Sequence, residues 1–246
     1  MKKVDKERLV TEFMTKEQIR ILETDFIEKQ LELQKKIDYT NAVNPDCVRT
    51  VAGVDLAYWK VDDEEHAVCC IVVIDYKSKE IVEKQYVSEK VDVPYIPGCL
   101  AFREIPLFLK AYAKVKTDVD VLFFDGNGYL HPRHMGLATH AGIEINKPTI
   151  GVAKSYFKID EVDFTMPSPE QNSYTDIVIA GEVYGRAVRT HERVKPIFLS
   201  IGNRIDIDTA MKMAVSLVTK DSHIPIPTRL ADIMTHEIRK MEEDAK

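Results

Sequence analysis

The feature that most limits the fold is a run of four apolar residues, Val121–Phe124, followed at once by Asp125 and then by Gly126 and Gly128. An apolar run of this length bounded by turn residues is typical of a buried strand. The glycines allow the backbone to turn tightly and to lie close to a ligand. A carboxylate at the end of a core strand, ahead of a glycine-rich turn and a helix, indicates a site for metal, phosphate or both. The alternative is a plain turn in which Asp125 caps the following helix.

Alternating and amphipathic segments on both sides of this run predict a mixed sheet flanked by helices. Strands are predicted at residues 49–59, 66–75, 80–87, 121–124, 148–153, 177–180, 184–189 and 196–201, and helices at 16–38, 98–116, 133–141, 209–219 and 228–242. The short polar links between the first strands predict antiparallel neighbours, and residues 181–182 are expected to form the turn of a hairpin. This order predicts an α/β or α+β fold in a single domain that spans residues 1–246.

The ends of the chain and of its helices carry further signals. Residues 1–40 are expected to form a helical segment that packs on the domain, and residues 242–246 a frayed tail. Pro106 lies inside the second predicted helix, where it indicates a kink or a later start of the helix. Asp206 or Asp208 is expected to cap the helix that follows.

Composition places the chain among ordinary soluble globular proteins: of its 246 residues, 45% are hydrophobic and 30% are charged. No apolar run approaches the roughly 20 residues that cross a bilayer, and no apolar stretch follows the basic N-terminus, so neither a membrane span nor a secretory signal is expected. The cysteines, none of them in a C-x-x-C pair, are Cys47, Cys69, Cys70 and Cys99. A reduced cytoplasmic protein is the simplest interpretation. The net charge of -6 argues against nonspecific coating of nucleic acid, but metal ions would offset clustered carboxylates in a local groove.

Three further acids stand out, and for two of them an unpaired charge would be costly. Asp55 lies inside the first predicted strand, where its neighbours on the same face are the small residues Gly53 and Ala57. A carboxylate there needs a partner or a metal, and the alternative is a strand face open to solvent. Glu104 lies on the apolar face of the second predicted helix and also needs a partner. Asp232 lies on the last predicted helix.

A three-strand meander followed by alternating helices and strands, with acids at these positions, is the layout of the ribonuclease H-like fold. Six motifs resemble those of the endonuclease V family: Val51–Asp55, Pro94–Glu104, Asp125–Gly128, His131–Arg133, Gly151–Ser155 and Gly202–Asp206. The resemblance runs from about residue 15 to residue 240, and the block that ends at Glu104 is highly specific. It implies a metal-dependent endonuclease of nucleic-acid repair that recognises deaminated bases, chiefly inosine. Such an enzyme hydrolyses the second phosphodiester bond 3′ of the lesion and leaves a 3′-hydroxyl and a 5′-phosphate.

The resemblance also implies catalytic roles. Asp55, Glu104 and Asp125 would be ligands of Mg²⁺, for which Mn²⁺ could substitute. Two such ions about 4 Å apart would activate a water and stabilise the leaving oxygen. Lys154 would neutralise the scissile phosphate or orient the attacking water. Asp232 stands where family members have Asp or His, and it would be either a ligand or an acid behind the ligands.

Lesion recognition would fall to a stiff segment, Pro94–Pro97, and to a pocket for the extruded base. The two prolines stiffen the segment, so that Tyr95 could fill the space left when the inosine flips out; without the resemblance, Tyr95 is a buried tyrosine in an ordinary loop. The residues implied in lesion or nucleic-acid binding are Pro94, Tyr95, Ile96, Pro97, Gly98, Leu100, Gly126, His131 and Leu137. The main chain of the glycines and leucines in this set would line the pocket. His131 would lie near the cut strand, whereas its own pattern indicates a helix-entry residue.

Other polar residues carry weaker signals. His134 and His140 lie six residues apart, which is not the spacing of a zinc pair on a helix, so both are expected to be structural. Asn203 stands where the family often has His, which leaves a phosphate contact from that turn open. The basic residues in and after the predicted hairpin, with one tyrosine, are Tyr184, Arg186, Arg189, Arg193 and Lys195. They would either contact phosphates or remain solvated.

The expected partner is inosine-containing DNA, single- or double-stranded, with RNA as an open alternative, and the protein is expected to be a monomer that binds no membrane. Two other functions remain open. One is a structure-specific nuclease of the wider ribonuclease H-like group that cuts flaps or hybrids. The other is a nucleic-acid binder with a decayed site, against which the intact set of acids and Lys154 argue.

Overall fold

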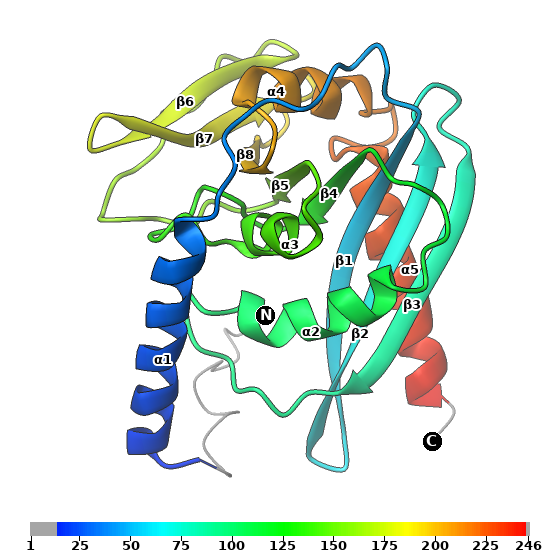
Figure 1. The fold of residues 1–246 in the computed structure, drawn as a ribbon. Helices are drawn as coiled ribbons and strands as arrows, with labels where there is room; N and C mark the ends of the chain where they lie inside the picture. Colours follow the sequence, from blue (N-terminus) through cyan, green and yellow to red (C-terminus); the bar gives the residue numbers. More distant parts are fainter. Residues whose placement is uncertain (1–13, 245–246) are drawn as a thin grey trace.

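The computed structural model describes residues 14–244, and within this range the strands form one eight-stranded sheet in the order β3-β2-β1-β4-β5-β8-β7-β6 (Figure 1). The strands are β1 (Thr50–Val61), β2 (Glu64–Asp75), β3 (Ile81–Lys90), β4 (Val121–Asp125), β5 (Thr149–Ala153), β6 (Ser173–Ile179), β7 (Glu182–Arg189) and β8 (Ile197–Asn203). The helices are α1 (Lys16–Gln34), α2 (Ala101–Tyr112), α3 (Leu137–Ile145), α4 (Ile207–Ser216) and α5 (Ile226–Asp244). The first part of the predicted N-terminal segment, residues 1–13, and the last two residues of the predicted tail, 245–246, lie outside the described residues.

β1 joins the antiparallel and parallel parts of the sheet. It pairs antiparallel with β2, which in turn pairs antiparallel with β3. On its other side β1 pairs parallel with β4, and β4 pairs parallel with β5. The strands β8, β7 and β6 complete the sheet in antiparallel pairs. The predicted mixed sheet, with its antiparallel meander at the start, is confirmed.

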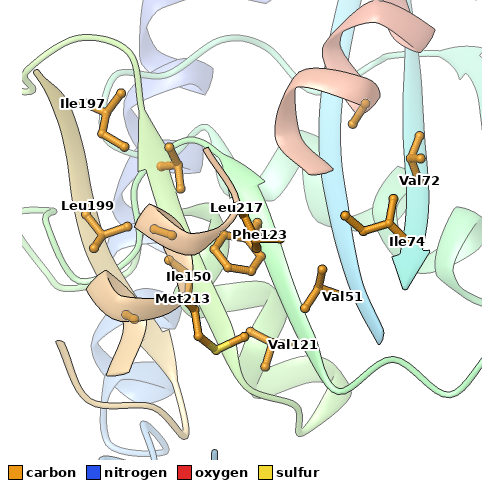
Figure 2. Packing of buried hydrophobic residues seen from close by; sticks show 14 of the residues in the cluster. Val51, Val72, Ile74, Val121, Phe123, Ile150, Ile197, Leu199, Met213 and Leu217 are labelled. Carbon is orange, nitrogen blue, oxygen red and sulfur yellow. The ribbon is translucent and has the colours of Figure 1, made fainter. Parts of the chain in front are cut away.

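Each face of the sheet carries its own apolar core, because side chains of the central strands alternate between faces. Val121 and Phe123 of β4 pack in the core under α4 and α5, whereas Leu122 and Phe124 pack in the core under α2 and α3. All four are fully buried, so the predicted buried strand is confirmed. Figure 1 shows α2 and α5 on opposite sides of β1 and β2. Figure 2 shows Val121 and Phe123 close to Met213 of α4.

The N-terminal helix α1 packs beside α2. It begins with a capping box in which Thr15 and Gln18 bond each other's main-chain N–H. Its inner face contacts α2 through Phe26, whose ring stacks on Phe102 with 4.2 Å between centroids. The helix ends at Gln34, before the predicted end at residue 38. Among the described residues, no helix combines the length and the apolar character that a membrane span requires.

Two predicted helices begin later than expected. α3 starts at Leu137 rather than at Arg133, because the preceding residues form a turn in which His134 has a left-handed φ of 54°. α2 starts after Gly98, which belongs to a separate turn with a φ of 74°. Pro106 lies inside α2, so the helix does not start after it.

The hairpin and the last strand differ from prediction in their bounds, and β6 begins at Ser173, four residues before its predicted start. The turn consists of Ala180 and Gly181, both with positive φ, because Ile179 pairs directly with Glu182. Such a two-residue turn matches the twist of the flanking strands. β8 continues through Asn203, beyond the predicted end of the strand.

Both C-terminal helices begin two residues earlier than predicted, α4 ends earlier, at Ser216, and α5 ends later. α4 begins at Ile207, directly after Asp206, whose carboxylate accepts a hydrogen bond from the N–H of Thr209. Of the two predicted caps, Asp206 is therefore the one that acts. α5 is helical as far as Asp244, so the tail predicted to fray from residue 242 is ordered to that point.

Candidate active site

Three carboxylates meet at one edge of the sheet. One carboxylate oxygen from each of Asp55, Asp125 and Asp232 lies within 4.8 Å of the others. β1 and β4 bring the first two together, because Val54 pairs with Phe124 in parallel register and the two acids are the next residues. The third comes from α5, which packs against β1.

Gly53 allows α5 to lie close enough to β1 to deliver Asp232. A Cβ at Gly53 would lie 1.8 Å from the carbonyl oxygen of Pro227, in the first turn of α5. No side chain fits within that distance. The start of α5 therefore lies directly on β1, and the following turn of the helix carries Asp232 to Asp55.

Lys154 lies beside the same acids. Val152 of β5 pairs with Asp125, and Lys154, two residues further along the chain, is directed to the same face. Its Nζ is 2.5 Å from Oδ2 of Asp125 and 2.7 Å from Oδ1 of Asp232. Burial opposes the ammonium, but the hydrogen bonds to the two carboxylates outweigh it, so the pKa of Lys154 is raised. The charged ammonium therefore holds both acids in place.

Negative charge is concentrated where little water reaches it. Burial raises the pKa of Asp55 to about 7, and the charge of Asp125 adds to the rise. Burial also raises the pKa of Asp125, against the effect of Lys154. Desolvated carboxylates that repel one another are stabilised by a cation, and a set made only of oxygens suits Mg²⁺ or Mn²⁺. The residues present therefore fit a hard divalent cation.

A buried hydroxyl on α5 orients Asp55. Thr235 is 1% exposed, and its Oγ1 lies 2.8 Å from Oδ2 of Asp55 and 2.8 Å from the carbonyl oxygen of Asp232. Donation to the carboxylate is the stronger of the two bonds because the acceptor is charged. This bond favours the charged form of Asp55 and lowers its pKa, against the effect of burial.

We expect Thr235→Val to weaken binding of Mn²⁺ about tenfold at neutral pH, because the pKa of Asp55 rises further and its carboxylate is no longer held. Titration calorimetry on the metal-free protein measures the change. Thr235→Ser keeps the hydroxyl and should retain the original affinity. An unchanged affinity in Thr235→Val would show that Thr235 contributes to packing alone.

Glu104, predicted as a third ligand, lies outside this group of three acids. α2 carries it on the opposite face of the sheet from α5, and its Oε1 accepts a hydrogen bond of 3.0 Å from the hydroxyl of Tyr58. Burial raises the pKa of Glu104 to about 8, and the charges of Asp55 and Asp125 add to the rise. The structure thus groups Asp232 with the two strand acids, while Glu104 faces them from the side of α2.

A cavity of 190 Å³ adjoins the three acids on the side of α2 and α3. It is lined by Tyr95, Gly98, Leu100, Ala101, Glu104, Asp125, Gly126, Asn127, His131, Met135, Gly136, Leu137 and Phe157. Asp125 belongs both to this lining and to the group of three acids. Six residues of the predicted lesion-binding set meet here, namely its two glycines, its two leucines, Tyr95 and His131. Their roles stay predictions.

The other three residues of that set, Pro94, Ile96 and Pro97, do not line the cavity. Ile96 is 2% exposed and packs with Phe26 of α1. Tyr95 is 39% exposed, so the alternative of a buried tyrosine is wrong. The segment is therefore anchored by Ile96 and presents Tyr95 at the cavity.

Phe157 is a residue of this site that was not predicted from the sequence. Its ring is 38% exposed and lies parallel to that of His131, with 6.2 Å between centroids. The only signal in the sequence is its position three residues after Lys154. Tyr58 and Thr235, which hydrogen-bond two of the acids, gave no signal because each lies far along the chain from its partner.

His131 is a neutral ring in the wall of the cavity. Its Nδ1 accepts hydrogen bonds of 3.2 Å and 3.3 Å from the main-chain N–H groups of Arg133 and Met135. The proton is therefore on Nε2, which donates to the carbonyl oxygen of Gly98 at 3.0 Å. Burial and the charge of Arg133 lower the pKa of His131 to about 4. His131 thus supplies no positive charge to a phosphate at neutral pH.

The other histidines of this region serve the fold, as expected. His134 stacks on Tyr129 with 3.8 Å between ring centroids. His140 is 4% exposed and meets Phe102 edge to face. Asn203 is also structural, because it accepts a hydrogen bond from the N–H of Asp38 and donates one to the carbonyl of Gly142.

Two arginines of the β6–β7 region are engaged by hydrogen bonds and ion pairs with other residues of the protein. Arg186 is bound by Asp176 at 2.8 Å and by Asp208 at 2.6 Å. Arg189 donates to the main-chain carbonyls of Ser168 and Pro167 at 2.7 Å and 3.1 Å. Both are buried, so for these two the predictions of phosphate contact and of solvated charge are both wrong. Their charges offset acids and carbonyls of the protein itself.

The sheet is mixed, and carboxylates from two adjacent strands and from the C-terminal helix meet beside a cavity. This arrangement is that of a nuclease with the ribonuclease H-like fold. The family model described as Endonuclease V matches residues 31–233. Endonuclease V of Bacillus thuringiensis subsp. konkukian is 54% identical over 216 residues, which cover 88% of this chain and 92% of the relative. The chain belongs to the endonuclease V family and is an endonuclease.

Solved structures of the family agree with this fold. The crystal structure of the endonuclease V from Bacillus subtilis superposes with a TM-score of 0.89 at 48% identity and covers 100% of both chains. Endonuclease V of Ciona intestinalis, solved in complex with a 24mer DNA containing an inosine followed by a ribo-adenosine, has a TM-score of 0.77 at 31% identity. That match covers 89% of this chain and 98% of the Ciona chain. The predicted ribonuclease H-like fold is confirmed.

Proposed function

We propose that this endonuclease recognises inosine in nucleic acid and, with Mg²⁺, hydrolyses the second phosphodiester bond on the 3′ side of the inosine. The products would carry a 3′-hydroxyl and a 5′-phosphate. The observation that carries the proposal is the double position of Asp125, which lies in the group of three acids and in the lining of the 190 Å³ cavity. A base held in the cavity would place its own strand against the acids. The inosine-containing DNA bound by the Ciona relative supports this substrate.

Asp55, Asp125 and Asp232 would hold the metal, with Glu104 facing them from α2. When bound, hard divalent ions in such a site activate a water and stabilise the leaving oxygen of a phosphodiester. Lys154 lies at the edge of the site with 40% of its side chain exposed, so its ammonium can reach a phosphate from solvent. Its role is to offset the charge of the scissile phosphate.

The cavity would take the extruded base. Unstacking a nucleotide costs a few kcal/mol, and least for a weakly paired base such as hypoxanthine. Gly98 and Gly126, with φ of 74° and 154°, present main chain to the cavity where other residues would be strained. The exposed ring of Tyr95 would then stack in the space that the base leaves.

The test is cleavage of matched DNA strands that carry inosine, adenosine or guanosine at one position, each with Mg²⁺ and with a chelator. We expect a nick only in the inosine strand with metal, at the bond specified above. Equal cleavage of undamaged flaps or hybrids would favour a structure-specific nuclease. Binding without any metal-stimulated cleavage would favour a nucleic-acid-binding protein whose catalytic site has decayed. The same set made in RNA tests whether RNA is also a substrate.

Tyr95→Ala is expected to weaken binding of the inosine strand about tenfold while leaving binding of Mn²⁺ unchanged, because stacking of one base on one aromatic ring contributes about 1–3 kcal/mol. Fluorescence anisotropy in Ca²⁺, a poor substitute for the octahedral geometry of Mg²⁺, measures it. Tyr86→Ala is the matched control, since Tyr86 is 40% exposed on β3, outside the cavity lining. Equal affinities of Tyr95→Ala and Tyr86→Ala would contradict the proposed wedge.

We further infer a monomer that acts in the cytoplasm. The three acids and the cavity come together within a single copy of the chain, which supports a monomer. The four cysteines are free, as expected of a reducing compartment. Light scattering of the purified protein measures its mass in solution, and a dimer would contradict the first part of this inference.

A further inference from the structure

We propose that Gln30 of α1 is a positioning residue that sets base selectivity by fixing the Gly98–Cys99 peptide in the wall of the cavity. This inference rests on the proposed function, because it takes the cavity to be the base pocket. It assigns to the N-terminal helix, which contributes no residue to the cavity lining, a part in recognition.

The carbonyl oxygen of Gly98 accepts three hydrogen bonds. They come from Nε2 of Gln30 at 2.9 Å, Nε2 of His131 at 3.0 Å and Nη2 of Arg133 at 2.9 Å. A carbonyl oxygen has two lone pairs, so its acceptor capacity is filled. The orientation of this carbonyl is therefore fixed from three directions.

The other end of the same peptide is also held. The N–H of Cys99 donates to the carbonyl of Ile96 at 2.9 Å, which closes a turn with Pro97 and Gly98 at its centre. The φ of Gly98 is 74°, the conformation that a glycine takes after proline in a type II turn. The peptide plane between Tyr95 and the start of α2 thus has both its oxygen and its N–H bonded.

Gln30 is the member of this network that packing alone does not require. It is 0% exposed, and an apolar side chain of similar size would cover the same surface without needing partners. Instead its Oε1 accepts a hydrogen bond of 2.5 Å from Nε of Arg133. A buried amide with both ends bonded orients its partners more strictly than an apolar contact does.

The geometry has a consequence for binding. Gly98 and His131 both line the cavity, so the Gln30–Arg133 pair holds a wall of it without touching its contents. If the peptide turned, Gly98 and the ring of His131 that is bonded to it would shift in the wall and change the shape that the cavity offers to a base. The acids on β1, β4 and α5 would stay as they are. Loss of Gln30 should therefore affect the choice of base and leave the metal site intact.

The test compares Gln30→Leu and Gln30→Glu with Leu22→Ala in the full chain. Gln30→Leu removes both hydrogen bonds, whereas Gln30→Glu keeps the acceptor for Arg133 and loses the donor to Gly98. Leu22→Ala loosens α1 at a partly buried apolar position that makes none of these bonds. The readouts are affinity for inosine and guanosine strands in Ca²⁺, affinity for Mn²⁺, and the exchange rate of the Cys99 amide proton.

We expect both Gln30 variants to lose about tenfold in preference for inosine over guanosine and to exchange the Cys99 amide about tenfold faster, with Mn²⁺ affinity unchanged. Leu22→Ala should lower the melting temperature and retain the preference. If the Gln30 variants resemble Leu22→Ala in all readouts, Gln30 is structural only and the inference is wrong. Should Gln30→Leu not fold, Gln30→Glu decides the comparison. Absence of any inosine preference in the unaltered protein would instead overturn the proposed function.

Discussion

Asp125→Asn is expected to reduce Mg²⁺-dependent cleavage about a thousandfold. Asp125 is the acid shared by the group of three carboxylates and the cavity, so its loss would remove a proposed metal ligand at the point where the scissile strand would lie. Asparagine has the same shape but a neutral amide, which binds a hard cation far less strongly than a carboxylate does. A thousandfold loss corresponds to about 4 kcal/mol of transition-state stabilisation, in the range expected for a metal site. Single-turnover cleavage of the inosine strand measures it.

The matched control is Asp118→Asn. Asp118 precedes β4 at the opposite end of the strand, where it is mostly exposed and bound to Lys147 at 2.7 Å. This substitution also neutralises one acid beside one lysine, but it lies away from the cavity, so cleavage should be unchanged. If Asp125→Asn retained cleavage comparable with Asp118→Asn, the acids at this edge would not form the catalytic site.

Glu104→Gln distinguishes two roles of Glu104, one as a metal ligand and one as an acid that acts on the substrate strand. A ligand would lose Mn²⁺ affinity together with cleavage, as Asp125→Asn should. An acid that acts on the substrate strand from the side of α2 would lose cleavage and retain the metal. The distinction matters because Tyr58 already occupies one oxygen of Glu104.

The strands and their acids could be predicted because their signals are local. Four apolar residues ahead of Asp125 specify a buried strand whatever surrounds them. The small neighbours Gly53 and Ala57 likewise marked Asp55 as unusual within its own strand. In both cases the pattern lies within a few residues, and the structure places both acids at the same edge.

The sequence could not predict which acidic residues of the helices lie beside Asp55 and Asp125. Their position depends on how the helices cross the sheet. Glu104 and Asp232 both lie on helices, but only α5 lies directly on β1 at the point where Gly53 faces Pro227. That contact joins residues far apart in the chain and leaves no periodic signal. The family resemblance implied Glu104 as a ligand and left the role of Asp232 open, whereas the structure groups Asp232 with the strand acids.

The predictions for the start of α3 and for the basic residues of the hairpin were wrong for the same reason. A Cβ at Gly136 would lie 2.3 Å from the carbonyl oxygen of Asn127, so close contact with the preceding loop decides where the helix begins. Arg186 was predicted to contact phosphate or to remain solvated, because one of its two partners, Asp208, lies in α4 and reaches Arg186 only in the folded chain. Short-range patterns carry neither contact.

Asp55 is expected to make the metal-free protein less stable, measured against Asp55→Asn, as the pH rises from about 4 to about 7. The carboxyl of Asp55 has a pKa of about 7 in the folded chain, chiefly because of burial, against the 3.8 of a free side chain. Between these values the folded state binds a proton that the unfolded state has lost. The contribution of Asp55 to stability therefore falls with rising pH across this window and levels off above it. The lowered pKa of His131 acts in the opposite direction, so the comparison with Asp55→Asn isolates the part due to Asp55. A shift of about three pH units corresponds to about 4 kcal/mol, or about 10 °C in melting temperature for a chain of this size.

The same linkage predicts how metal acts on stability. A divalent ion binds the deprotonated carboxylates, so Mn²⁺ should raise the melting temperature strongly at pH 8 and little at pH 5, where Asp55 holds its proton. Thermal unfolding at both values, with ion and with chelator, measures the effect. Asp55→Asn has no proton to release, so it should lack the loss of stability that Asp55 causes between these pH values and should abolish most of the gain from Mn²⁺. A gain from Mn²⁺ that is equal at pH 5 and pH 8 would mean that the ion binds elsewhere, and the assignment of the three acids would fail.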